Sequence, residues 1–103
     1  MKATLSSTAI RELLAAGDLI SAESRGAARG FSRTVSEALS MIGQHPEIGA
    51  LRQELADPPV RFWTLHRYHY LLVYDPSVSP PQVLRILHGA RDLPDLLSNL
   101  RWD

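Results

Sequence analysis

The sequence has 103 residues, of which 45% are hydrophobic, eleven are basic and eleven are acidic, so the formal net charge at pH 7 is zero. A chain of this size can bury a hydrophobic core without a disulfide, and we expect residues 1–103 to form one domain. Neutrality argues against binding nucleic acid through bulk positive charge, and the absence of cysteine excludes a disulfide framework and a thiolate nucleophile.

No segment is predicted to cross or enter a membrane. The longest apolar run, YLLVY at residues 70–74, is far below the roughly 20 residues that span a bilayer. The N-terminal sequence lacks an apolar segment of the length that a secretory signal needs. A protein without cysteine is compatible with a reducing compartment, and we expect a cytoplasmic location.

A first helix is predicted after a short opening stretch, KATL. The cluster at residues 6–8 offers an N-cap, and apolar residues follow it at mostly helical spacing as far as Ile20. Gly17 interrupts this pattern, because glycine weakens a helix interior.

A second helix is predicted from the apolar residues that recur at three- and four-residue steps over residues 27–42. Gly43 and Pro46 are expected to end it. Charged residues repeat every four positions on another face: Arg25, Arg29, Arg33 and Glu37. This row could bind an anion, but a solvated face with an Arg33–Glu37 pair is the simpler interpretation.

The aromatic and β-branched segment at residues 60–75 predicts strand structure. It is too long for one ordinary strand of about five or six residues. We therefore place a break between two strands near residues 66–68, although no Gly or Asn marks a tight hairpin there.

A third strand is predicted at residues 82–88, after a turn at residues 76–81. Strict alternation would place Leu84, Ile86 and His88 on one face, and Val83, Arg85 and Leu87 on the other. After Gly89, Asp92 can cap a last helix. The fold class is therefore α+β: a helical hairpin on one face of a curved antiparallel sheet of three to four strands, with a short C-terminal helix. The other sheet face has no predicted cover.

The four histidines do not predict a metal site. In an extended strand His66 and His69 would point to opposite faces, and no HExxH helix is present. A Ser/His/Asp hydrolase is also not indicated, because the nucleophile elbow is missing. We expect neither a metal nor a cofactor.

Basic residues concentrate in the second half of the chain: Arg52, Arg61, His66, Arg67, His69, Arg85, His88 and Arg91. Histidine and arginine can cleave RNA without a metal, by moving protons and stabilising a charged phosphorane. These residue types are not specific, since a histidine at a turn or in a core usually just satisfies the backbone.

Three segments together resemble the RelE/ParE superfamily of toxins from bacterial type II toxin–antitoxin modules, and most closely its ParE branch. They are HPEIGALRQEL at 45–55, VRFWTLHRYHYLLVYD at 60–75 and VLRILHGARDLPDLL at 83–97. The P-x-x-G-x-x-R-x-E-L element and the ending RILHGARDL carry the specific part of the match, while the helical N-terminal third matches only in pattern. The family fold agrees with the α+β prediction.

The resemblance implies a cognate antitoxin that wraps the toxin as a hetero-oligomer, and contact with operator DNA only through that antitoxin. It also implies that His88, Gly89 and Asp92 are a structural signature, in which a strand ends and a helix is capped. The arginines expected to bind a partner are Arg52, Arg61, Arg67, Arg85 and Arg91.

Two mechanisms occur among proteins similar to this one. ParE-like toxins are associated with plasmid stabilisation and with poisoning DNA gyrase through a protein interface. RelE-like toxins are ribosome-dependent mRNA endonucleases, and that alternative would make Arg61, Arg67 and His88 catalytic. The neutral charge, the single lysine and the missing terminal tyrosine favour the ParE-like activity, which is not enzymatic. A toxin-like fold kept only as a DNA-binding co-repressor is a third possibility.

Overall fold

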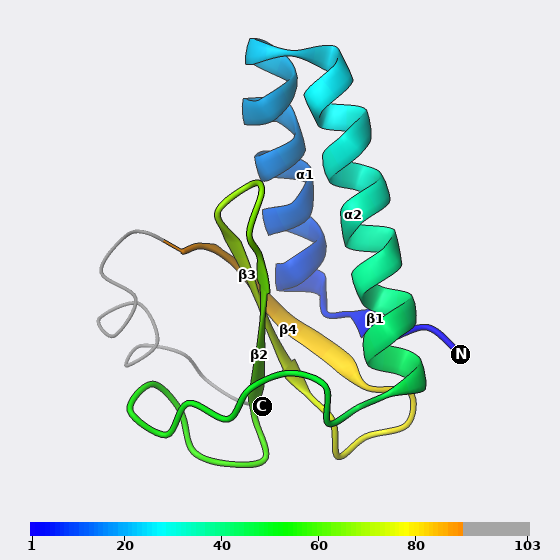
Figure 1. Ribbon diagram of the computed structural model, residues 1–103, viewed down its shortest axis with the longest axis vertical. Coiled ribbons are helices and arrows are strands. Elements are labelled where there is room, and N and C mark those ends of the chain that lie inside the picture. Colours follow the sequence, from blue (N-terminus) through cyan, green and yellow to red (C-terminus); the bar gives the residue numbers. More distant parts are fainter. Residues whose placement is uncertain (90–103) are drawn as a thin grey trace.

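The structure is a computed structural model that describes residues 1–89. A helical hairpin packs on one side of a four-stranded sheet (Figure 1), so the predicted α+β class is confirmed. The elements in chain order are β1 (Thr4–Leu5), α1 (Ser7–Glu23), α2 (Arg25–Gln44), β2 (Arg61–Leu65), β3 (Tyr70–Asp75) and β4 (Gln82–His88). The predicted C-terminal helix with its Asp92 cap, and Arg91, lie outside the described residues.

The strand order in the sheet is β1-β4-β3-β2. Strands β2, β3 and β4 are antiparallel as predicted, and the break in the long segment falls at residues 66–69. The sheet is nevertheless mixed, because β1 pairs in parallel with the start of β4. Two residues are too few for a periodic sequence signal, and β1 is recognisable only from its bonds to β4, such as Ser6 N to Val83 O at 2.9 Å.

Serine side chains begin both helices. Ser6 is the N-cap of α1 and its hydroxyl accepts a hydrogen bond from Ala9 N at 3.0 Å. Ser24 alone separates the helices. Its backbone N–H donates to Ile20 O at the end of α1, and its hydroxyl accepts from Ala27 N at the start of α2. The hairpin therefore turns on one residue.

Helix α2 does not end at Gly43, contrary to the sequence prediction. It continues to Gln44 with His45 as the C-cap. Gly43 is buried where the N-terminal strand crosses the helix, and a Cβ there would overlap the Met1 carbonyl oxygen and lie 2.8 Å from Lys2 Cα. The glycine is thus required by a close approach of two backbones rather than by a helix end.

The arginine row of α2 is a solvated face, as expected. Arg25, Arg29, Arg33 and Glu37 are all exposed. The expected Arg33–Glu37 pair is not formed, because the side-chain ion pairs within residues 1–89 are Arg52–Glu54 and Arg85–Glu12.

Apolar clusters occupy both sides of the sheet. The larger one lies between the helices and the sheet, and its fully buried members include Phe31, Ile42, Leu72, Tyr74 and Val83. The second lies on the opposite side and consists of Val60, Phe62, Leu71, Val73 and Leu87, with Leu55, Ala56 and Leu84 packed against it. The prediction of an uncovered second face is therefore wrong for the described residues, since its strand residues are buried.

The predicted alternation along β4 is also wrong at one point. The β3–β4 register shifts between Val73 and Tyr74, so that Val73 pairs with Arg85 while Tyr74 pairs with Val83. Leu84 is the extra residue of this bulge. As a result Val83 joins Ile86 in the core under the helices, and Leu84 joins the second cluster.

Within residues 1–89 no helix is long and apolar enough to cross a membrane.

Replacing either of two helical glycines by alanine should change the stability of the fold, in opposite directions at the two positions. Gly17→Ala adds a methyl group with nothing within 4 Å and should stabilise the fold by about 0.5 to 1 kcal/mol, because alanine favours the helix. Gly43→Ala should destabilise the fold by about 1 to 3 kcal/mol, since the backbone of Met1 and Lys2 must move. Urea unfolding of the two variants measures both changes. A stabilised Gly43→Ala would contradict the close-approach explanation.

Candidate functional site

The Arg61 side chain forms hydrogen bonds with a loop of its own chain. Its Nη1 donates to Glu47 O at 3.1 Å and to Gly49 O at 2.8 Å. Arg61 starts β2 and pairs with Tyr74 on β3, so the guanidinium is fixed at the end of the sheet that faces residues 46–49. These two hydrogen bonds give the P-x-x-G part of the motif, residues 46–49, a structural role.

Tyr74 completes this clamp from the core. Its hydroxyl donates to Pro46 O at 2.7 Å and accepts from Gly49 N at 2.8 Å. A Cβ on Gly49 would lie 2.6 Å from the Tyr74 ring, so only glycine allows this approach. Burial raises the pKa of the Tyr74 phenol above its ordinary value of 10.0, against the opposing effects of the Gly49 hydrogen bond and the Arg61 charge.

Arg85 is also engaged within the chain. Its Nη2 lies 2.7 Å from Glu12 Oε2, and its Nε lies 3.0 Å from each carboxylate oxygen. The same carboxylate accepts Ile86 N at 2.9 Å. Both side chains are three-quarters or more buried. In the isolated chain Arg85 therefore attaches α1 to the edge of β4, and its partner-binding role stays a prediction.

Arg67 and His88 lie at the end of the sheet opposite Arg61. Arg67 is exposed in the β2–β3 turn, with its guanidinium carbon 5.9 Å from the Tyr68 ring centroid. His88 is an exposed residue that ends β4 and packs edge-on against Tyr70 at 5.2 Å. Gly89 N donates to His69 O at 2.6 Å. The predicted end of the strand at His88 and Gly89 is confirmed, but His88 is not a core residue.

The three residues of the endonuclease alternative are not brought together. Arg61 pairs with Tyr74, whereas His88 pairs with Tyr70, four residues earlier on β3. At the usual strand dimensions Arg61 and His88 are about 13 Å apart along the strands and about 10 Å apart across them. Because the Arg61 guanidinium is bonded to Glu47 O and Gly49 O, it points away from His88, and the two side chains do not converge on one phosphate.

Arg52 is exposed and its Nε bonds Glu54 Oε1 at 2.8 Å. The pKa of Glu54 is lowered from its ordinary value of 4.5, first by a bond with its own backbone and then by Arg52. Arg52 also lines a cavity of about 220 Å³ beyond the hairpin, together with Thr64, His66, His69, Tyr70, Leu71 and Gly89. The prediction that His66 and His69 point apart is wrong, because a turn rather than an extended strand carries them.

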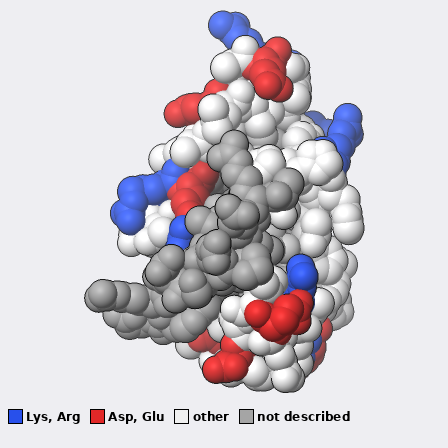
Figure 2. Space-filling model, turned by 90° about the vertical axis from the view of Figure 1, so that its left-hand side faces the viewer, with Lys and Arg blue, Asp and Glu red and all other residues white. Residues whose placement is uncertain are grey.

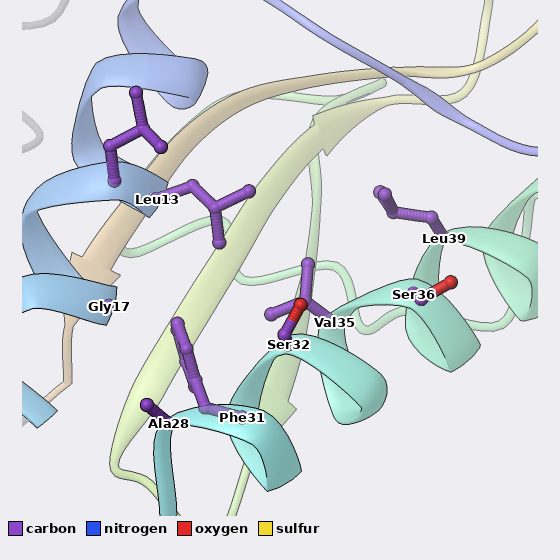
Figure 3. A pocket seen from close by; sticks show the side chains of 9 residues that line it. Leu13, Gly17, Ala28, Phe31, Ser32, Val35, Ser36 and Leu39 are labelled. Atoms are coloured by element: carbon purple, nitrogen blue, oxygen red, sulfur yellow. The ribbon is translucent and has the colours of Figure 1, made fainter. Parts of the chain in front are cut away.

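A groove of about 330 Å³ runs between the two helices. It is lined by Leu13, Leu14 and Gly17 of α1 and by Ala28, Phe31, Ser32, Val35, Ser36 and Leu39 of α2. Figure 3 shows Leu13 and Phe31 pointing into the space between the helices. Leu14 is 64% exposed at its rim. Sequence reasoning missed this groove, although the apolar residues exposed on α1 exceed what one buried face requires.

On the face of the molecule drawn in Figure 2, the described charged side chains do not form one basic surface. The basic and acidic side chains described there lie in small separate groups. Within residues 1–89 there is also no group of three or more histidine and carboxylate side chains arranged to hold a metal ion.

Two helices packed on a four-stranded mixed sheet are compatible with the fold of the RelE/ParE superfamily of toxins. Residues 3–93 match the family described as "ParE toxin of type II toxin-antitoxin system, parDE", and the chain therefore belongs to that family. No curated protein matches the sequence.

Tyr74→Phe tests the clamp and its pH dependence. Losing the hydroxyl leaves Gly49 N–H and Pro46 O without their partner and should cost about 1 to 3 kcal/mol at neutral pH. The raised pKa means that above pH about 10 the unfolded phenol ionises first, so wild-type stability falls as pH rises.

Urea unfolding between neutral and alkaline pH should show a shallower alkaline loss in Tyr74→Phe than in the wild type. Parallel curves for the two proteins would contradict a raised pKa at this tyrosine.

Proposed function

We propose that the chain is a growth-inhibiting toxin that acts on DNA gyrase through a protein contact and is neutralised by its cognate antitoxin. The family membership supports a toxin of a type II module. The observation that favours gyrase over messenger RNA is the position of Arg61. Its guanidinium bonds two loop carbonyls at the end of the sheet remote from His88, and a phosphorane needs converging donors.

Antitoxin binding is proposed for the groove between α1 and α2. The groove is apolar at its floor, where Phe31 and Val35 are buried. Ile10, one turn before Leu13 and Leu14, is 45% exposed and extends the apolar stripe. This shape suits an amphipathic helix laid along the hairpin.

The rim of the groove selects an acidic partner. Lys2 Nζ donates to Ser36 Oγ of the lining at 2.6 Å. Helical spacing places exposed Arg25 and Arg29 beside Ala28 on α2, and exposed Arg11 beside Leu14 on α1. Asp18 is the one acidic residue among these rim positions. The occupant is therefore an antitoxin segment with an apolar face flanked by aspartate or glutamate.

The target is tested by a paired assay of the purified toxin. Supercoiling by gyrase should be blocked, and ribosome-bound message should stay intact, because Arg61 lies at the opposite end of the sheet from Arg67 and His88. Arg67→Ala and His88→Ala, both at exposed positions, serve as folded variants. Site-specific cleavage of message that either variant abolishes would transfer the assignment to the RelE-like endonucleases.

The groove is tested with two leucines of α1 that are almost equally exposed. Leu14 lines the groove at 64% exposure, and Leu19 at 67% is not among the lining residues. Leu14→Asp should weaken antitoxin binding at least tenfold. The substitution places a carboxylate in an apolar groove, and the proposed antitoxin segment is itself acidic. Leu19→Asp should bind as the wild type does. Titration of both purified variants with antitoxin measures the difference, and equal affinities would exclude the groove.

A further inference from the structure

The cavity beyond the β2–β3 hairpin has the chemistry of an anion site, and it shares no lining residue with the groove between the helices. Its polar lining comes from Arg52, Thr64, His66 and His69, and its volume is about 220 Å³. That volume equals about seven water molecules at 30 Å³ each. A phosphate group with part of the molecule that carries it can be accommodated.

The backbone fixes the two histidines on this cavity. Residues 66–69 connect the last β2–β3 pair, Leu65 with Tyr70, and Tyr68 N bonds Leu65 O at 3.2 Å. His69 has a φ of 60°, a left-handed conformation that reverses the chain and that histidine adopts more readily than most residues. The bond from Gly89 N to His69 O then anchors the turn to the end of β4.

Charge around the cavity favours an anion over a metal ion. The described lining contains Arg52, His66 and His69 and no acidic residue. Glu54 occupies only the Nε of Arg52, so the Nη donors can serve a ligand. A guanidinium repels a cation, and it binds phosphate oxygens in a forked geometry.

We propose that this cavity binds a phosphate group, with His66, His69 and Arg52 as its ligands. The group comes either from a free nucleotide or from the backbone of a single-stranded nucleic acid. Each imidazole ring offers an N–H donor to a phosphate oxygen, and Thr64 adds a hydroxyl donor. No bond is made or broken in this site, because Arg61 lies at the other end of the sheet and cannot reach the same phosphate.

The test is an NMR titration of the full-length toxin with inorganic phosphate, a nucleoside 5′-monophosphate and a short single-stranded oligonucleotide. Saturable shifts confined to Arg52, residues 64–71 and Gly89 are expected. His66→Gln/His69→Asn should weaken binding at least fivefold, with asparagine chosen because it tolerates the left-handed conformation. His45→Gln, an exposed histidine at the end of α2, is the matched control and should bind normally.

Arg52→Gln, at an exposed position, gives a second variant if the turn substitutions disturb folding, and Arg33→Gln on α2 is its control. Tighter binding of the mononucleotide than of the oligonucleotide identifies a terminal phosphate, and the reverse order identifies a nucleic-acid backbone. Shifts that do not saturate with any of the three probes would overturn the proposal. So would affinities that are the same in the cavity variants and their controls. Either result leaves the gyrase assay unaffected.

Discussion

One carboxylate joins the helical hairpin to the sheet. Strand β1 covers only the first two residues of β4, so beyond Val83 the outer edge of β4 has no partner strand within residues 1–89. Ser6 Oγ bonds Leu84 O, and Glu12 accepts hydrogen bonds from Ile86 N and the Arg85 side chain. Charged hydrogen bonds of this kind are stronger than neutral ones. The position of α1 on the sheet, and therefore both the core beneath it and the groove beside it, depends on this contact.

Local signals were sufficient to predict most elements. The serine at the start of α1, the helical apolar spacing of α2 and the polar turn at residues 76–81 each act over a few residues, and the structure confirms all of them. The third predicted strand agrees with β4 residue for residue. The resemblance to a toxin family, which depended on short motifs in the second half of the chain, is confirmed over residues 3–93.

Roles that depend on distant residues were not predictable. Arg85 meets a carboxylate 73 positions earlier in the chain, and nothing near either residue in the sequence indicates the pairing. Gly43 looked like a helix end because its contact with the N-terminal strand has no local signal. The bulge at Leu84 likewise follows from pairing with β3, and one extra residue reverses which side chains reach each face. The sequence shows the basic residues of the second half only as one set, and their separation into a clamp, an edge contact and a cavity needed three dimensions.

The single-residue connection at Ser24 has a consequence for recognition. Both helices are capped by the same residue, so their separation is set before any partner arrives, and the groove between them does not have to form during binding. The toxin then contributes almost no ordering entropy to the association, and that cost falls on the partner segment. Affinity can therefore be adjusted by the helical tendency of the partner alone, while the toxin surface stays the same.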